Sequence, residues 1–137
     1  MSGKLTALSA GYAICGALQN ALKDKVTAIY PVYSTSEDAK VPYIVYFRDG
    51  VQLQSDKSED NRDTCNIVVQ VYDTDYDRGL ELIEEARAAL EKQKIIWSDD
   101  DDPSKRLTVN CTKVTDSAED WDMGLYLQQI TIGCKIS

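Results

Sequence analysis

The sequence contains no histidine, only one phenylalanine and only three prolines. Without histidine, neither a Ser-His-Asp nor a Cys-His catalytic arrangement can form, and the commonest general base is missing. No glycine-rich loop follows a predicted strand, so the phosphate-binding motifs of nucleotide enzymes are absent as well. These absences predict that the chain is not an enzyme.

Positive charge is also scarce, since 15 lysines and arginines stand against 23 aspartates and glutamates, for a net charge of -8. A general nucleic-acid binder needs a basic surface to offset phosphates, and docking on an anionic membrane needs one too. No apolar run approaches the roughly 18 residues of a membrane span. We therefore expect neither specific nucleic-acid binding nor a membrane location.

The N-terminal segment combines a lysine with small and apolar residues, so a signal peptide has to be considered. Tyr12, Gln19 and Asn20 interrupt the apolar run, and no clear cleavage site follows. An amphipathic helix from about Thr6 to Lys23 is the better interpretation, and the protein is expected to be cytoplasmic where it is made. The apolar stripe expected on this helix is Leu8, Tyr12, Cys15, Leu18 and Leu22.

The four cysteines, at positions 15, 65, 111 and 134, form no CxxC pair. Three of them lie on the apolar faces of predicted strands, which favours buried, reduced thiols. Zinc binding is disfavoured, because histidine is absent and the spacings differ from those of zinc sites.

The segment from Thr64 to Leu90 is the clearest structural unit, a strand followed by a helix. Apolar residues alternate with others from Thr64 to Tyr72, which predicts a strand. A helix is expected to follow, with Thr74 capping the amide of Asp77. The apolar stripe expected on this helix is Tyr76, Leu80, Ile83, Ala86 and Leu90.

The remaining patterns predict strands on both sides of this unit. The expected strands are Val26 to Val32, Val41 to Phe47, Arg106 to Thr115 and Leu125 to Ile136. Residues 50–63 are expected to form a hairpin extension, 98–105 an acidic loop, and 116–124 a turn region. The prediction is one α+β domain over residues 1–137, in the order α-β-β-β-α-β-β. Its antiparallel or mixed sheet would have about four to five strands, with two helices packed on one face.

One acidic pattern has the spacing of a metal site. Asp73, Asp75, Asp77 and Glu84 stand at positions 1, 3, 5 and 12 of an EF-hand calcium loop. Arg78 occupies the sixth position, where the sharp turn needs glycine, and a strand precedes the motif where a helix should. An acidic helix N-terminus is the better interpretation, and no metal or cofactor is predicted. The run 99–102 is interpreted as a solvated loop, with weak divalent-ion binding as the alternative.

Three segments together resemble the small tail-completion proteins of long-tailed bacteriophages and prophages, a group that includes tail terminators and tail-to-head joining proteins. They are IYPVYSTSEDAKVPYIVYF, CNIVVQVYDTDYDRGLELIEEARAAL and DMGLYLQQITIGCKI. The resemblance covers most of the chain from Ile29 onward, plus an N-terminal helix of suitable length. The chain departs from the family pattern in its SDKSEDNRD and DDDDPSK segments.

The resemblance implies a non-enzymatic structural protein that closes the head-proximal end of the tail tube and joins tail to head. It implies a homo-oligomeric ring, with a hexamer favoured, and as partners the tail tube protein and head connector proteins. The expected location is the virion, with the host bacterial cytoplasm during assembly. The alternatives are another phage connector or neck module of similar fold, or a small ligand- or calcium-binding domain.

A ring of identical subunits needs heterologous contacts, in which one patch meets a different patch on its neighbour. Sheet edges, hairpins and exposed tryptophans are natural suppliers of such contacts. Trp97 and Trp121 both flank loops, where each either closes the end of the core or anchors a contact. The candidate contact residues are Gln52, Gln54, Lys57, Glu59, Arg62, Asp101, Lys105 and Trp121.

Overall fold

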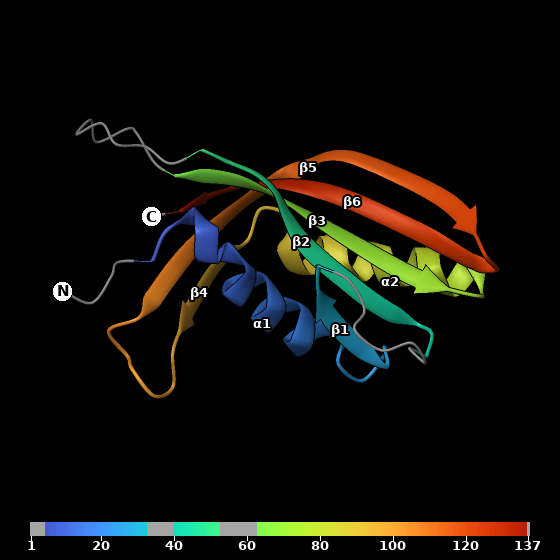
Figure 1. The fold of residues 1–137 in the computed structure, drawn as a ribbon, viewed down its shortest axis with the longest axis horizontal. Helices are drawn as coiled ribbons and strands as arrows, with labels where there is room; N and C mark the ends of the chain where they lie inside the picture. The colour runs from blue at the N-terminus through green and yellow to red at the C-terminus, as the bar shows by residue number, and fades with distance from the viewer. Residues whose placement is uncertain (1–4, 33–39, 53–62, 137) are drawn as a thin grey trace.

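The computed structural model describes residues 5–32, 40–52 and 63–136 of the chain. It has the α+β fold expected from the sequence, with two helices against a curled sheet of six strands (Figure 1). A 3-10 turn, Ala7–Ser9, leads into α1, Ala10–Leu22, and the second helix is α2, Tyr76–Leu90. The strands are β1 (Ala28–Pro31), β2 (Tyr43–Gln52), β3 (Thr64–Asp73), β4 (Lys94–Ser98), β5 (Arg106–Asp122) and β6 (Leu125–Ile136).

The sheet is mixed, with the strand order β1-β2-β3-β6-β5-β4. Only β1 and β2 run parallel, and the other neighbours are antiparallel, including β2 and β3 as the sequence predicted. The sheet has one more strand than expected because Lys94–Ser98 pairs with the first residues of β5. Its five residues are too short a run to show a clear alternation.

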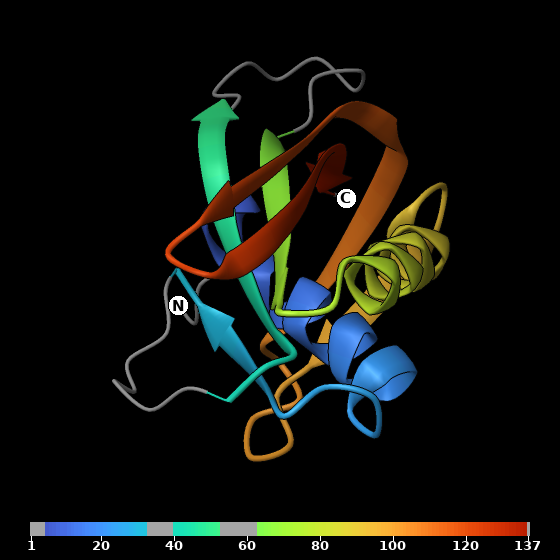
Figure 2. The same cartoon turned by 90° about the vertical axis from the view of Figure 1, so that its right-hand side faces the viewer.

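The core lies between the helices and one face of the sheet. The alternating residues of β3 predicted to face inward are all buried, and α1 and α2 cover this same face (Figure 2). The remaining sheet residues of the core come mainly from β6 and β5: Ile130, Ile132, Cys134, Ile136, Leu107, Val109 and Cys111.

The buried side of α1 differs from the predicted stripe. Leu8 and Tyr12 are more than half exposed, and Cys15 is only partly buried, whereas Leu18 and Leu22 are buried as expected. Gly11 stands near the sheet, where an added Cβ would be in ordinary van der Waals contact, 3.5 Å from the Tyr46 ring. The residues that α1 buries are Ala10, Ala13, Ile14, Leu18 and Leu22.

The start of α2 also differs from the prediction. Its N-cap is Asp75 rather than Thr74, and the Asp75 carboxylate accepts a hydrogen bond of 3.2 Å from the Arg78 amide. Tyr76, expected on the buried stripe, therefore stands in the exposed first turn. Gly79 and Leu82 are buried together with Ile83, Ala86 and Leu90.

The segment 116–124, expected to be a turn region, is mostly strand. β5 continues to Asp122, and only Met123 and Gly124 form the connection to β6. Both have positive φ, 51° and 85°, which is the signature of a two-residue type I′ hairpin turn. Residues 116–130 form the far half of the β5–β6 hairpin, here called the arm, which extends beyond the end of β4 (Figure 1). Along the arm, β6 also pairs with β3, so the β5 side is a free sheet edge.

Candidate protein-contact surfaces

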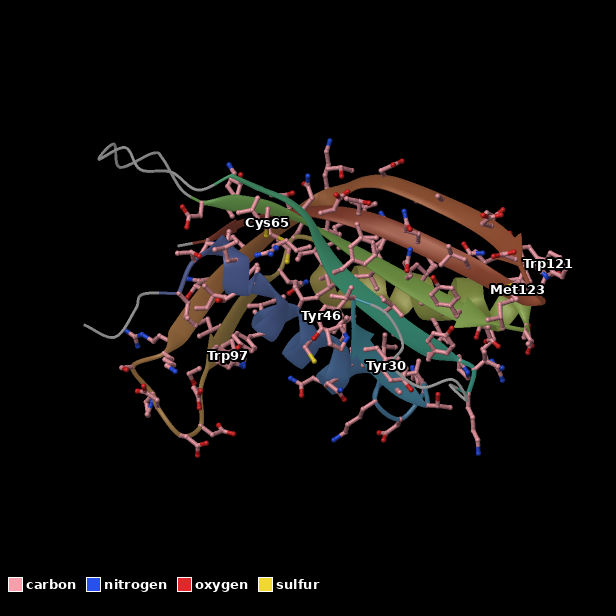
Figure 3. The ribbon with its side chains drawn as sticks, in the orientation of Figure 1. Tyr30, Tyr46, Cys65, Trp97, Trp121 and Met123 are labelled. Atoms are coloured by element: carbon pink, nitrogen blue, oxygen red, sulfur yellow. The ribbon has the colours of Figure 1, made fainter. Side chains whose placement is uncertain are left out.

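The end of the arm carries an exposed apolar cluster, here called the arm tip, made of Tyr76, Trp121 and Met123. Their exposed fractions are 38%, 58% and 90%. Trp121 lies opposite Tyr126 across the arm, and the Tyr126 ring meets Tyr76 edge to face at 5.3 Å between centroids. Figure 3 shows Trp121 and Met123 together at the extreme end of the molecule. Tryptophan is the residue type most often found as an anchor of protein interfaces.

Hydrogen bonds fix the arm tip to α2. The Tyr76 hydroxyl donates to the Glu119 carboxylate at 2.7 Å, and the Gln128 amide donates to the same oxygen at 3.0 Å. These bonds, from Gln128 first and Tyr76 second, lower the pKa of Glu119, so the carboxylate stays ionised as their acceptor. Tyr76 is therefore fixed against the arm through Glu119 before any partner binds.

Acidic side chains surround the arm tip. Asp75 and Asp77 flank Tyr76, while Asp120 and Asp122 flank Trp121, and all four are exposed. The tip is thus an apolar centre with a negatively charged rim. A partner surface that fits it needs an apolar hollow with positive charge nearby.

The bend of the arm depends on Glu91, just after the end of α2. The β5 ladder is interrupted around Val114, and the Val114 amide donates to the Glu91 carboxylate at 2.7 Å. Arg87 donates to the other oxygen at 3.0 Å. The hydrogen bond from Val114, followed by the charge of Arg87, lowers the pKa of Glu91. The carboxylate thereby replaces the strand partner that the bulge removes.

We expect Glu91→Ala to loosen this bend, because the Val114 amide then loses its acceptor. Hydrogen exchange of the Val114 amide should become at least about tenfold faster, while core amides of β3 keep their protection. Glu91→Gln, which retains an acceptor oxygen, is the matched control and should change the rate far less. Equal exchange at Val114 in all three proteins would contradict this role.

A groove on another part of the surface lies between the start of α1 and the β1–β2 edge. Its volume is about 420 Å³, and its apolar walls include Leu8 and Val32, which are 53% and 63% exposed. Tyr46 and Tyr12 also line it, and the Tyr12 ring stacks on Trp97 at 4.6 Å between centroids. Trp97 is thus held against α1 and partly buried, unlike Trp121.

Arg48 supplies positive charge at the groove. Its guanidinium donates to the Leu8 carbonyl at 2.9 Å, so it is fixed at the groove wall by a backbone group. None of the ion pairs between described residues involves Arg48. Its charge is therefore not neutralised by a carboxylate from the described part of its own chain.

The opposite face of the sheet carries a row of tyrosines. Tyr43 stacks on Tyr72 at 5.0 Å between centroids, and Tyr30 meets Tyr43 edge to face at 5.8 Å. The Tyr72 hydroxyl donates to Gln70, whose amide donates to Gln129 at 2.7 Å. The side chains of this row make ring contacts and hydrogen bonds with one another, so cross-strand packing explains their presence.

The three strand cysteines are buried and free, as predicted. Cys65, Cys134 and Cys111 lie in register across β3, β6 and β5, and the sulfurs of Cys111 and Cys134 are 3.6 Å apart. The described residues contain no group of three or more side chains placed to hold a metal ion. Within the described ranges, no helix is long and apolar enough to cross a membrane.

The predicted contact residues do not form one site. Gln54, Lys57, Glu59 and Arg62 lie outside the described residues, as does the side chain of Gln52 at the end of β2. Asp101 and Lys105 are exposed in the loop between β4 and β5. That loop and the β5–β6 turn next to Trp121 lie at opposite ends of the molecule (Figure 1). The loop contains its own hydrogen bonds, from the Asp101 amide to Asp99 and from the Lys105 amide to the Asp102 carbonyl.

Other surface residues were not predicted from the sequence. The sequence pattern places Met123 in a turn region and Tyr76 on a buried stripe, and it contains no local signal for Arg48. A tryptophan and a methionine within an otherwise acidic turn were the one available indication of the arm tip. The groove joins residues distant in the sequence and had no such indication.

The architecture is a small α+β domain with an exposed arm and an apolar groove, a class that many unrelated functions share. No protein-family model matches the sequence, and no curated protein sequence matches it. Solved structures do share the fold. One is a chain from the virion of a native gene transfer agent (GTA) particle, which is 16% identical and has a TM-score of 0.55. The match covers 91% of this chain and 98% of that chain.

A second solved chain, whose name describes no function, is 14% identical and has a TM-score of 0.53. It matches over 91% of this chain and 94% of its own length. At these identities the likeness establishes a common fold. In both cases the alignment spans nearly the whole of the other chain, so the domain is shared in full.

Proposed function

We propose that this chain is a structural component of a phage-like virion, which caps the head-proximal end of the tail tube and joins tail to head. It acts as a ring of identical subunits, and a hexamer is favoured by the resemblance to tail-completion proteins. The observation that carries the proposal is the near-complete structural match to a chain of a gene transfer agent virion. The sequence resemblance points independently to the same kind of particle.

The surface chemistry supports an assembly role without catalysis. The most exposed large apolar side chains include Trp121 and Met123 at the arm tip, which suit protein contacts. The net charge of -8 suits a ring through which DNA slides without being held. The partners in this role are the tail tube protein and head connector proteins, in the host bacterial cytoplasm during assembly and in the virion afterwards.

Deleting the gene from the phage or prophage that encodes it tests the role. A cap stops growth of the tube by covering its end, so we expect tubes of uneven length and heads without tails in electron micrographs. Supplying the chain in trans should restore joined particles of uniform length. Joined, normal particles without the chain would refute the proposal.

A second candidate is a connector or neck module, because the name of the matching virion chain does not state its position in the particle. The same deletion separates the two roles. A neck module joins finished parts, so its loss should leave tubes of normal length and heads that are unjoined. Uneven tubes indicate a cap.

A further inference from the structure

The arm tip and the groove complement each other. The tip presents an indole and a thioether inside an acidic rim, and the groove is an apolar hollow with Arg48 at its wall. We propose that the arm tip of one subunit docks into the groove of a second copy of this chain, with Trp121 and Met123 inserted and the acidic rim paired with Arg48. This inference rests on the ring of the proposed function and names its subunit contact.

The sizes and charges of the two surfaces agree. A hollow of about 420 Å³ is in the range of pockets that hold small molecules of about 300–1,000 Å³, so it accommodates an indole ring with a methionine side chain. Arg48 forms no ion pair with a described carboxylate, while Asp120 and Asp122 form none with a described cation. Bringing the two surfaces together pairs charges that are otherwise left to solvent.

The turn at the arm tip also indicates an external role for Met123. A type I′ turn favours asparagine or glycine at both central positions, because φ is positive there. Met123 adopts φ 51° and is 90% exposed, so its side chain contributes little to the fold and its backbone is disfavoured. A residue with these properties is best explained by a contact that the isolated chain does not make.

The two surfaces lie in separate regions of the molecule, so one chain cannot satisfy both. The tip is at the free end of the arm, and the groove is beside the start of α1 (Figure 3). A contact between different patches of identical subunits is heterologous, and it propagates from copy to copy into a ring when the rotation between subunits closes, or into a filament when it does not. Tip-in-groove docking is therefore the kind of contact that the proposed function requires.

The test uses two variants, each with one defective surface. Trp121→Ala with Met123→Asn removes the tip while placing a favoured residue in the turn, and Leu8→Asp places a charge in the groove. Sedimentation velocity across a concentration series should show higher oligomers for the unmodified chain. Each variant alone should remain monomeric, with association weakened at least about thirtyfold, as expected for a lost interface anchor.

Mixing the two variants gives the decisive result. The intact tip of the Leu8→Asp chain can enter the intact groove of the tip variant, so an equal mixture should form one-to-one dimers and nothing larger. Circular dichroism and thermal melts of each variant establish that it is folded, and Asp100→Ala is a surface control that should assemble normally. A wild-type chain that stays monomeric, a variant that still assembles, or a mixture without dimers overturns the docking.

The charge pairing is tested separately. Arg48→Glu should prevent assembly of a chain with the normal arm, and Asp120→Lys with Asp122→Lys should prevent it by the same repulsion. Combining all three changes in one chain should restore it. Continued loss in the combined variant overturns the pairing.

Failure of the docking and failure of the proposed function can be told apart by combining the two experiments. If the gene deletion disrupts particles but the mixed variants do not dimerise, the docking is wrong and the structural role stands. If the dimers form but particles are complete without the chain, the contact is real and the proposed role is wrong.

Discussion

Replacing Ile132 with alanine should lower the free energy of unfolding by about 3–4 kcal/mol, a loss typical of a buried isoleucine in a core that cannot collapse around the cavity. Ile132 is fully buried in β6, where it faces Ile67 of β3 on one side and Val114 of β5 on the other. Ile67 is held by strand pairing on both sides, and the Val114 backbone is held by its hydrogen bond to Glu91, so neither can move far into the vacated space. Urea unfolding should show a lower midpoint with an unchanged slope.

Ile96→Ala is the matched control, since Ile96 is 69% exposed on β4 and the same atoms are removed. Its cost should be within about 0.5 kcal/mol, as for ordinary surface substitutions. Equal losses at Ile132 and Ile96 would show that the sheet face carrying Ile132 is not packed against the helices in solution.

The elements predicted best from the sequence are those whose apolar periodicity records a packed face. β3 alternates from Cys65 to Val71, and the structure buries those residues against the helices. α2 occupies the predicted residues because its acidic start and unbroken apolar repeat are both local signals. For such elements, the local sequence is sufficient to predict both the secondary structure and the buried face.

The arm could not be predicted in this way. From Asp116 to Asp122, every residue of β5 is exposed, so neither side of the strand packs on the core and no alternation records it. Its strand conformation comes from hairpin pairing with β6, which imposes no burial pattern on the residues of β5. The Met123-Gly124 turn lacks the asparagine or aspartate that usually marks a two-residue hairpin.

The orientation of α1 was missed for a related reason. Its larger side chains predict that Leu8 and Tyr12 face the core. The structure instead turns the side of α1 that carries Ala10, Ala13 and Ile14 toward the sheet. The side of α1 that packs on the sheet depends on the shape of the sheet surface, and the sequence of the helix does not contain that information. The consequence is functional, because the displaced Leu8 and Tyr12 line the groove.

Among the predicted contact residues that the structure describes, Trp121 is the one that lies on an exposed apolar surface. Its neighbours on that surface are Met123, from the β5–β6 turn, and Tyr76, from the start of α2. These two residues are far apart in the sequence. A contact surface assembled across elements becomes visible only when the fold brings them together.

Asp73→Ala should be the second largest perturbation and should cost about 2 kcal/mol, the scale for hydrogen bonds to a charged group. Asp73 is fully buried at the end of β3, and the Arg78 guanidinium of α2 donates a hydrogen bond of 2.6 Å to each of its two carboxylate oxygens. The Asp75 amide donates to it as well, at 3.2 Å. The carboxylate thus connects the central strand to the start of the helix that supports the arm tip.

The cost of Asp73→Ala should depend on pH in a defined direction. Burial alone raises the pKa of a carboxyl group, but the hydrogen bonds from Arg78 and from the backbone outweigh it and hold the pKa of Asp73 below its ordinary value. A carboxyl with a lowered folded pKa adds stability above its unfolded pKa of about 3.9. That stability is lost as pH falls through the folded value.

The difference in unfolding free energy between the wild type and Asp73→Ala should therefore be constant near neutral pH and shrink below about pH 4. Urea titrations at a series of pH values measure it, and Asp100→Ala, at an exposed loop carboxylate, should show almost no difference at any pH. A gap that is absent at pH 7, or that widens in acid, would mean that the charge on Asp73 does not hold the strand to the helix. If the gap behaves as expected, the same variant should also speed hydrogen exchange of the Gly79 amide, which donates to the Asp75 carbonyl in the first turn of α2, since the helix start that positions Tyr76 depends on this carboxylate.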